Sequence, residues 1–217
     1  MSPRIDPGAL LLVAITDSLR DGIEGLVARA SAAVDGGATM VQLRLKDEGP
    51  RTLVEVARAL LRAVPAVPLL VNDRADVALA AGAHGVHVGV DDLPPAALRR
   101  IVPSGFIIGA SVGDDAEVER AAEADYVGIG PVYATGSKLD AGAAIGVARF
   151  AELARRCGVP AVAIGGITPA NAGEVYDAGA SGIAVISAVF SAGDPRQAAR
   201  DLRAVLSPRD GRDATGR

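Results

Sequence analysis

Cysteine, tryptophan and lysine are scarce in this 217-residue sequence, which has one cysteine, no tryptophan and two lysines. A single cysteine cannot form a disulfide within the chain, so a disulfide framework is excluded and Cys157 is expected to be a small core residue in a reducing compartment. Aromatic residues are 3% of the chain while hydrophobic residues are 50%. The core must therefore be built from Ala, Val, Leu and Ile.

Long apolar runs and runs of one charge are also missing. The N-terminal apolar run at 9–15 is far shorter than the ~20 residues of a membrane-spanning helix, and no signal-peptide cleavage site follows it. No stretch holds five or more like charges and the net charge is −4, which argues against nucleic acid as the main partner. We expect a cytoplasmic protein bound to neither membrane nor nucleic acid, and the sequence leaves a homo-oligomer open.

The sequence is instead dominated by short apolar β-branched runs that alternate with helical patterns. Strands are expected at 10–16, 40–46, 68–72, 85–89, 106–111, 126–132, 160–165 and 182–188. Helices are expected at 22–36, 49–64, 75–82, 94–101, 114–123, 145–157, 169–178 and 194–206.

Strict alternation of apolar strands with helices indicates a parallel sheet covered by helices. Eight such units predict an α/β fold, a (β/α)8 TIM barrel that forms one domain over 1–206. An open doubly wound sheet is the alternative, but no G-x-G-x-x-G follows the first strand. The end of the chain, 207–217, lacks apolar periodicity and is expected to be a disordered tail.

Polar and apolar residues alternate in the expected strand 40–46, so Gln42, Arg44 and Lys46 share one face. In a barrel this face would point inward, towards the mouth where active sites lie. Lys46 and Lys138 are the two lysines of the chain, and each follows an expected strand. Such cations need an anionic partner, which predicts a phosphate or diphosphate. A solvated edge strand and a chance placement of the lysines remain alternatives.

Acidic residues follow two neighbouring strands. Asn72 and Asp73 end the strand at 68–72, and Asp92 follows the strand at 85–89. Asp73 and Asp92 could share Mg2+, with phosphate oxygens and water as the other ligands. Asp92 could also be the N-cap of the next helix.

Other strand ends carry weaker signals. His87 alternates with two valines and is expected to face inward as a structural histidine. Gly165, Gly166 and Ser187 end the last two strands, where barrels of this kind commonly bind phosphate.

The glycine-rich stretch "ATGSKLDAG" at 134–142 does not match a nucleotide P-loop. Gly130 and Gly136 are one residue too far apart for G-x-x-x-x-G-K-[ST], and Ser137 precedes Lys138 instead of following it. The loop is better interpreted as an anion site of another kind.

Five segments together resemble the thiamine phosphate synthase family over nearly the whole chain: "GGATMVQLRLK", "LLVNDRADVALAAGAHGVHVGVDDL", "IIGAS", "GIGPVYATGSKLDAG" and "AIGGITPANAGEVYDAGASGIAVISAV". The resemblance implies a transferase of thiamine biosynthesis that binds two small molecules and uses Mg2+. It would join 4-amino-5-hydroxymethyl-2-methylpyrimidine diphosphate to 4-methyl-5-(2-phosphoethyl)thiazole, and release diphosphate through a pyrimidine cation that needs no obligatory general base.

The resemblance also implies a role for each matching residue. Gln42 would contact the pyrimidine, and Asp73 and Asp92 would bind Mg2+. The diphosphate would be held by polar side chains, of which the three cations would also be catalytic: Arg44, Lys46, Asn72, Ser111 and Lys138. The thiazole phosphate would be held by two hydroxyl side chains and by backbone groups: Thr135, Ser137, Gly166, Ile186 and Ser187.

Two places in the sequence depart from the family pattern. Val90 stands where the family usually has Gln, and Val112 and Gly113 replace a polar pair that often includes His. A thiazole tautomerase and a non-catalytic thiazole-phosphate-binding regulator of the same fold are the alternatives, although neither needs the acids and lysines of the diphosphate site. A Schiff-base aldolase would need a lysine inside a strand.

Overall fold

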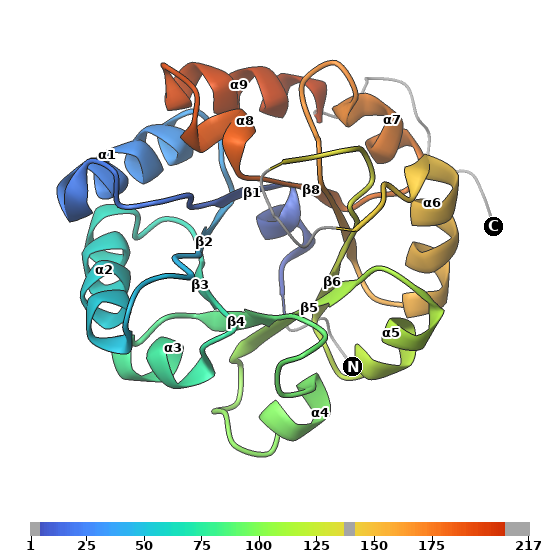
Figure 1. Ribbon diagram of the computed structural model, residues 1–217, viewed down its shortest axis with the longest axis horizontal. Helices are drawn as coiled ribbons and strands as arrows, with labels where there is room; N and C mark the ends of the chain where they lie inside the picture. Colours follow the sequence, from blue (N-terminus) through green and yellow to red (C-terminus); the bar gives the residue numbers. More distant parts are fainter. Residues whose placement is uncertain (1–4, 137–141, 207–217) are drawn as a thin grey trace.

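Eight parallel strands close into a barrel in the order β1 to β8, and helices surround it (Figure 1). The computed structural model describes residues 5–136 and 142–206, so the expected tail at 207–217 lies outside the described residues. The strands are β1 (Leu12–Ile15), β2 (Met40–Leu43), β3 (Leu69–Asn72), β4 (Gly85–Val88), β5 (Ile107–Val112), β6 (Tyr126–Ile129), β7 (Ala161–Ile164) and β8 (Gly182–Val185). The predicted (β/α)8 TIM barrel is confirmed.

One short helix precedes β1, and the other described helices follow the strands. They are η1 (Pro7–Leu10), α1 (Gly22–Asp35), α2 (Pro50–Ala63), α3 (Ala75–Ala81), α4 (Pro95–Leu98), α5 (Asp115–Arg120), α6 (Gly146–Cys157), α7 (Ala172–Asp177), α8 (Ser187–Phe190) and α9 (Pro195–Val205). None of these helices is long and apolar enough to cross a membrane.

The alternation of side chains along each strand creates two apolar layers. In β1, Leu12 and Ala14 belong to the layer between strands and helices, whereas Val13 and Ile15 belong to the layer inside the barrel. The outer layer is completed by apolar helix faces, such as Val56 and Leu60 of α2. Ala, Val, Leu and Ile make up most of both layers, as the low aromatic content predicts.

The short helix η1 closes one end of the barrel. It lies within the ring of strands in Figure 1, and Ile5 and Leu10 pack into the inner layer with Met40 and Tyr126. Because η1 enters β1 from its N-terminal side, the N-terminal ends of the strands are covered. The interior therefore remains accessible from the carboxyl ends.

Several expected strands were too long, and two of these contain predicted site residues beyond the observed strand end. β2 ends at Leu43, so Arg44 and Lys46 lie beyond the strand and not on its inward face. The expected strand 182–188 ends at Val185, and Ser187 begins α8, an extra short helix before α9. Alternating or apolar sequence continues past the last strand-to-strand hydrogen bond in both places, and the pattern alone gives no end point.

Candidate active site

A cavity of about 460 Å³ opens among the carboxyl ends of the strands. It is lined by residues from most strands and by the loops that follow them. Eight residues with predicted substrate roles line it: Gln42, Arg44, Asn72, Ser111, Thr135, Gly166, Ile186 and Ser187. Residues that are far apart in the sequence thus share one cavity, at the end of the barrel where this fold places its chemistry.

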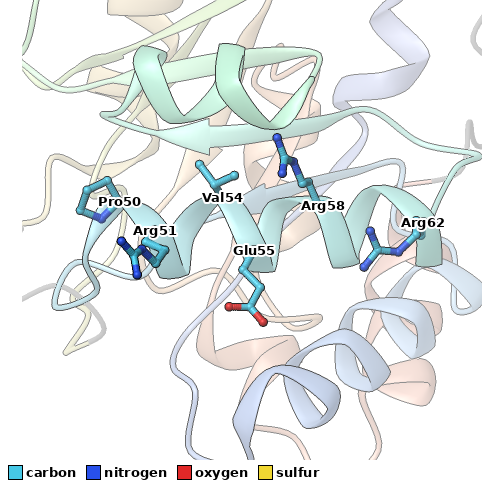
Figure 2. Close-up of a pocket in the computed structure, with 6 residues that line it drawn as sticks. All are labelled: Pro50, Arg51, Val54, Glu55, Arg58 and Arg62. Carbon is cyan, nitrogen blue, oxygen red and sulfur yellow. The ribbon is translucent and has the colours of Figure 1, made fainter.

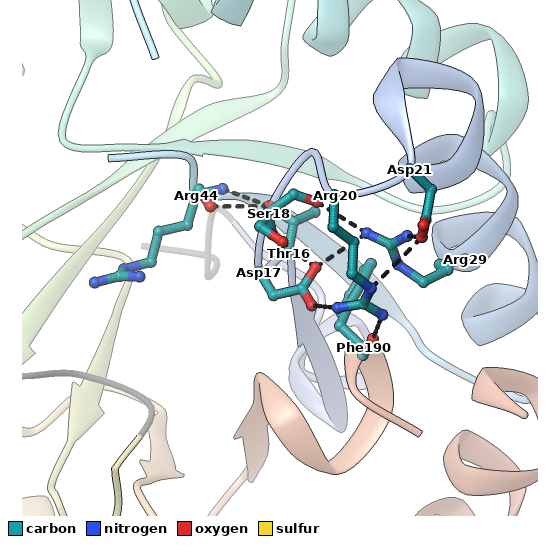
Figure 3. Close-up of polar contacts among 8 residues, drawn as sticks. All are labelled: Thr16, Asp17, Ser18, Arg20, Asp21, Arg29, Arg44 and Phe190. Carbon is teal, nitrogen blue, oxygen red and sulfur yellow. Dashed lines mark hydrogen bonds and ion pairs between the residues drawn. The ribbon is translucent and has the colours of Figure 1, made fainter. Parts of the chain in front are cut away.

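One wall of the cavity carries amide and guanidinium groups from β2, β3 and the loop after β2. Gln42 is 3% exposed, and its Nε2 donates to Oδ1 of Asn72 at 2.8 Å. Arg44 lies two residues further along, and its backbone is held by the buried Thr16 (Figure 3). The β2–β3 register, which pairs Gln42 with Leu70, brings these side chains to neighbouring positions.

The two predicted metal ligands lie together beside this wall. Asp73 directly follows β3, and its N–H donates to the carbonyl of His87 at 2.8 Å, which attaches it to β4. Asp92 folds back onto the same strand end, where its Oδ2 accepts from the Gly89 N–H at 2.7 Å. The carboxyl groups of Asp73 and Asp92 lie close enough to interact with each other.

Asp73 is electrostatically unusual. Burial, followed by the charge and hydrogen bond of Asp92, raises the pKa of Asp73 to about 6, although Lys46 and Arg44 act in the opposite direction. The predicted cations and acids of this site are therefore close enough to influence one another. Asp73, Asp92 and Lys46 stand beside the cavity and do not line its wall.

The opposite wall is formed by the loops after β6, β7 and β8. Gly165 and Gly166 have φ values of 97° and 64°, which favour glycine, and a Cβ on Gly166 would lie 2.6 Å from the carbonyl oxygen of Ala134. Asn171 braces this turn, because its Nδ2 donates to the Gly166 carbonyl at 2.9 Å and its Oδ1 accepts from the Thr168 N–H at 2.8 Å. The turn keeps its backbone at the cavity.

The loop after β6 packs against this turn. Tyr133 N donates to the Gly165 carbonyl at 3.1 Å, and its hydroxyl donates to Glu174 Oε2 at 2.9 Å. Thr135 lines the cavity. Ser137 and Lys138, which were expected to bind the two phosphate groups from this loop, lie outside the described residues.

Polar residues also form the floor of the cavity. His87 points into the barrel, with Nδ1 3.0 Å from the Tyr126 hydroxyl and Nε2 3.1 Å from Ser111 Oγ. Gly109 and Gly128 make room for the imidazole, since a Cβ on either would lie within 3.2 Å of a ring atom of His87. His87 faces inward, as predicted. It also contacts Ser111, a residue predicted to hold the diphosphate.

Sequence reasoning missed Glu117. It lines the cavity from α5, and its Oε2 accepts from the Gly113 N–H at 2.5 Å. An acidic residue in the first turn of a helix is ordinarily explained by the helix dipole, so the sequence offered no distinct signal. Val90 and Gly113, two of the departures from the family pattern, line the cavity close to this carboxylate.

A second hollow, of about 510 Å³, lies along the outer face of α2 (Figure 2). Arg51, Glu55, Arg58 and Arg62 project from one side of the helix there. The hollow is lined by α2 residues and includes none of the predicted site residues. Its arginines can serve as controls for Arg44, which lines the cavity.

A family model and individual relatives of this chain share one description. The family model described as thiamine monophosphate synthase matches residues 12–189. A thiamine-phosphate synthase of Xanthobacter autotrophicus is 47% identical over 204 residues, which cover 92% of this chain and 97% of that protein. One from Methanoculleus marisnigri is 52% identical over 181 residues, with 82% and 85% covered.

Solved structures agree with these relatives. The thiamine phosphate pyrophosphorylase of Pyrococcus furiosus superposes with a TM-score of 0.83 at 39% identity, and 92% of this chain and 96% of that chain are covered. A 3-hexulose-6-phosphate synthase has a TM-score of 0.68 at 21% identity, with 90% and 99% covered, and shows the fold alone.

Proposed function

This chain belongs to the thiamine monophosphate synthase family and is a transferase that forms thiamine phosphate, and from this premise we propose its substrates and the residues that act on them. The proposed reaction joins 4-amino-5-hydroxymethyl-2-methylpyrimidine diphosphate to 4-methyl-5-(2-phosphoethyl)thiazole. The bond from the pyrimidine methylene carbon to the diphosphate oxygen breaks, and a bond from that carbon to the thiazole nitrogen forms. The products are thiamine phosphate and diphosphate, and we place the reaction in the cytoplasm.

The diphosphate is proposed to bind between the loops after β2 and β3. Arg44 and Lys46 bring positive charge close to Asp73 there, and Asn72 and Ser111 line the adjacent cavity wall. A forked guanidinium and a mobile ammonium suit the non-bridging oxygens of a diphosphate. As the carbon–oxygen bond breaks, negative charge grows on the leaving group, and fixed cations accelerate the step. Lys138 is proposed to add a further cation from the loop after β6.

Asp73 and Asp92 fit a Mg2+ site. The two carboxyl groups interact, and the pKa of Asp73 is raised to about 6 partly by the charge of Asp92, so a cation between them would relieve their repulsion. Carboxylate oxygens are the ligands that Mg2+ prefers. Among the described residues no cluster holds three or more His, Cys, Asp or Glu side chains, so substrate and water oxygens would complete the coordination. Bound Mg2+ would supply charge neutralisation for the leaving diphosphate.

The thiazole phosphate is proposed to bind at the opposite wall. Thr135, the backbone of Gly166 and Ile186, and Ser187 line that side of the cavity. Ser137 is proposed to join them. Gln42, held by Asn72, would orient the pyrimidine ring between the two phosphate sites. In this proposal both substrates bind in the same cavity.

One observation carries the proposal: Gln42, Arg44, Asn72 and Ser111 line one cavity, and the interacting pair Asp73 and Asp92 lies beside it. The test incubates the purified protein with both phosphorylated heterocycles, with and without Mg2+, and measures thiamine phosphate and diphosphate. Both should form in equal amounts with Mg2+ present. Failure to form thiamine phosphate in the presence of Mg2+ would refute the proposed reaction.

Variants test the proposed residues separately. Asp92→Ala and Lys138→Ala should each lower kcat at least about a hundredfold while far-ultraviolet circular dichroism stays unchanged. Arg62→Ala, which removes an arginine from the last turn of α2, is the matched control for Arg44→Ala and should leave the rate unchanged. Unimpaired activity in both Asp92→Ala and Lys138→Ala would contradict the assigned site.

A further inference from the structure

Thr16 follows β1 and is completely buried, although its side chain is polar. Its backbone N–H donates to the Gln42 carbonyl at 3.0 Å and extends the β1–β2 pairing by one bond. At Arg44, two residues further along, the backbone hydrogen bonds between β1 and β2 end and the Thr16 hydroxyl bonds to the Arg44 backbone instead. The Arg44 N–H donates to Thr16 Oγ1 at 2.8 Å, and Thr16 Oγ1 donates to the Arg44 carbonyl at 3.2 Å.

This contact fixes the backbone of Arg44 where β2 no longer does. Both of the Arg44 backbone groups are satisfied by one hydroxyl, and a buried backbone group without a partner is costly. Figure 3 shows the guanidinium of Arg44 directed away from Thr16, and the residue lines the cavity. The hydroxyl thus holds one end of Arg44 and leaves the other end available to the site.

The rest of the same loop is anchored to the opposite side of the cavity. Arg20 forms an ion pair with Asp17, and its Nη2 donates to the Phe190 carbonyl at 2.5 Å (Figure 3). Phe190 ends α8, which begins at the cavity residue Ser187. Arg29 from α1 pairs with Asp17 and Asp21 and so fixes the loop itself. Thr16 is therefore part of a loop whose position is fixed by these ion pairs and hydrogen bonds.

We propose that Thr16 is a positioning residue for Arg44, and that it sets the affinity for the pyrimidine diphosphate although it does not line the cavity. The inference rests on the proposed role of Arg44 in holding the diphosphate. In this proposal the Thr16 hydroxyl fixes the backbone of Arg44 just beyond β2, and thereby fixes the point from which the guanidinium side chain extends. Loss of the hydroxyl should affect one substrate and not the other.

The experiment compares Thr16→Val, which keeps the shape and removes the hydroxyl, with Thr16→Ser, which keeps the hydroxyl. Thr16→Val should raise KM for the pyrimidine diphosphate about tenfold, with KM for the thiazole phosphate within about twofold of the wild type. Thr16→Ser should restore the wild-type value. Ser18→Ala, which removes an exposed hydroxyl from the same loop, is the matched control and should change neither constant.

An Arg44→Ala background separates positioning from general damage. There, Thr16→Val should raise KM for the pyrimidine diphosphate no further, because residues that act through each other are not additive. A further rise of similar size, or an unchanged KM in Thr16→Val alone, would overturn the inference while the proposed function stands. If Arg44→Ala itself leaves this KM unchanged, the proposed role of Arg44 fails and the inference fails with it.

Folding is checked by circular dichroism before the kinetics. If Thr16→Val does not fold, Thr16→Ala takes its place beside Thr16→Ser and is judged by the same two Michaelis constants. Equal constants in Thr16→Ala and Thr16→Ser would also overturn the inference.

Discussion

Nε2 of His87 lies 3.1 Å from Oγ of Ser111, and this contact decides which way the serine hydroxyl can donate. The other ring nitrogen, Nδ1, lies 3.0 Å from the hydroxyl of the fully buried Tyr126. Burial raises the pKa of Tyr126, so the phenol keeps its proton. A buried phenol donates its proton to a partner, which makes Nδ1 the acceptor and Nε2 the donor to Ser111. The serine proton is then directed to the cavity, where an anionic substrate would accept it.

Replacement of Tyr126 by Phe should remove this control of the histidine tautomer. The lost hydrogen bond is expected to lower the free energy of unfolding by about 1 kcal/mol. Nitrogen-15 NMR of the imidazole should report the Nε2–H tautomer in the wild type and a mixture in Tyr126→Phe. Tyr176→Phe, a tyrosine of α7 on the other side of the strand layer, is the control. A wild-type His87 with its proton on Nδ1 would contradict the argument.

Asp73 should make the stability of the Mg2+-free protein depend on pH. Its pKa is raised from 3.8 to about 6 in the folded state, so between these values the folded protein binds more protons than the unfolded chain. The contribution of Asp73 to the free energy of unfolding therefore falls as pH rises from about 4 to about 6. Asp73→Asn does not titrate, and its melting temperature minus that of the wild type should increase over this window.

The measurement is thermal unfolding with a chelator at pH 4.5 and pH 7. The difference between the two proteins cancels the titrating groups that do not interact with Asp73. Asp91→Asn changes an exposed carboxylate next to Asp92 and serves as the control. A difference in melting temperature that is the same at both pH values would refute the predicted sign. With Mg2+ added at pH 7, the wild type should gain stability and Asp73→Asn should not.

Asn171 should matter for the thiazole phosphate alone. Its amide bridges the Gly166 carbonyl and the Thr168 N–H, and both of these residues line the cavity. Asn171→Ala removes two hydrogen bonds worth about 1 kcal/mol each, so KM for the thiazole phosphate should rise about tenfold. KM for the pyrimidine diphosphate should stay the same. Gln197→Ala removes an exposed amide from α9 and should change neither constant; equal effects of Asn171→Ala on both would contradict the prediction.

The sequence predicted the barrel well because eight apolar runs alternate with helical patterns in order. Asp73 and Asp92 lie near each other, as expected for residues that follow neighbouring strands, and the β3–β4 register pairs Asn72 with His87. Strand ends were less predictable. The alternation of Gln42, Arg44 and Lys46 continues in the sequence past the last residue of β2. The strand itself ends earlier because the backbone N–H of Arg44 bonds to the Thr16 side chain and not to the backbone of β1.

The floor of the cavity could not be predicted from the sequence. Tyr126 begins an apolar strand and looks like any core aromatic residue, and its contact with His87 forms only when β4, β5 and β6 close around the interior. Gly109 gave no signal either, because a glycine inside a strand has several common explanations. Its role depends on which side chains face it after closure.

Gly109→Ala should therefore be far more damaging than an ordinary glycine substitution. The added Cβ would lie 2.4 Å from Cζ of Tyr126 and 2.5 Å from Nδ1 of His87, and neither ring can move without disturbing the inner layer. The free energy of unfolding should fall by about 1–3 kcal/mol, and activity should fall with it as Ser111 loses its partner. Gly193→Ala, where no atom lies within 4 Å of the new Cβ, is the matched control. Urea unfolding measures the stability of both variants. Equal midpoints for the two variants would contradict the prediction, because they would show that the barrel interior can accommodate the added methyl group.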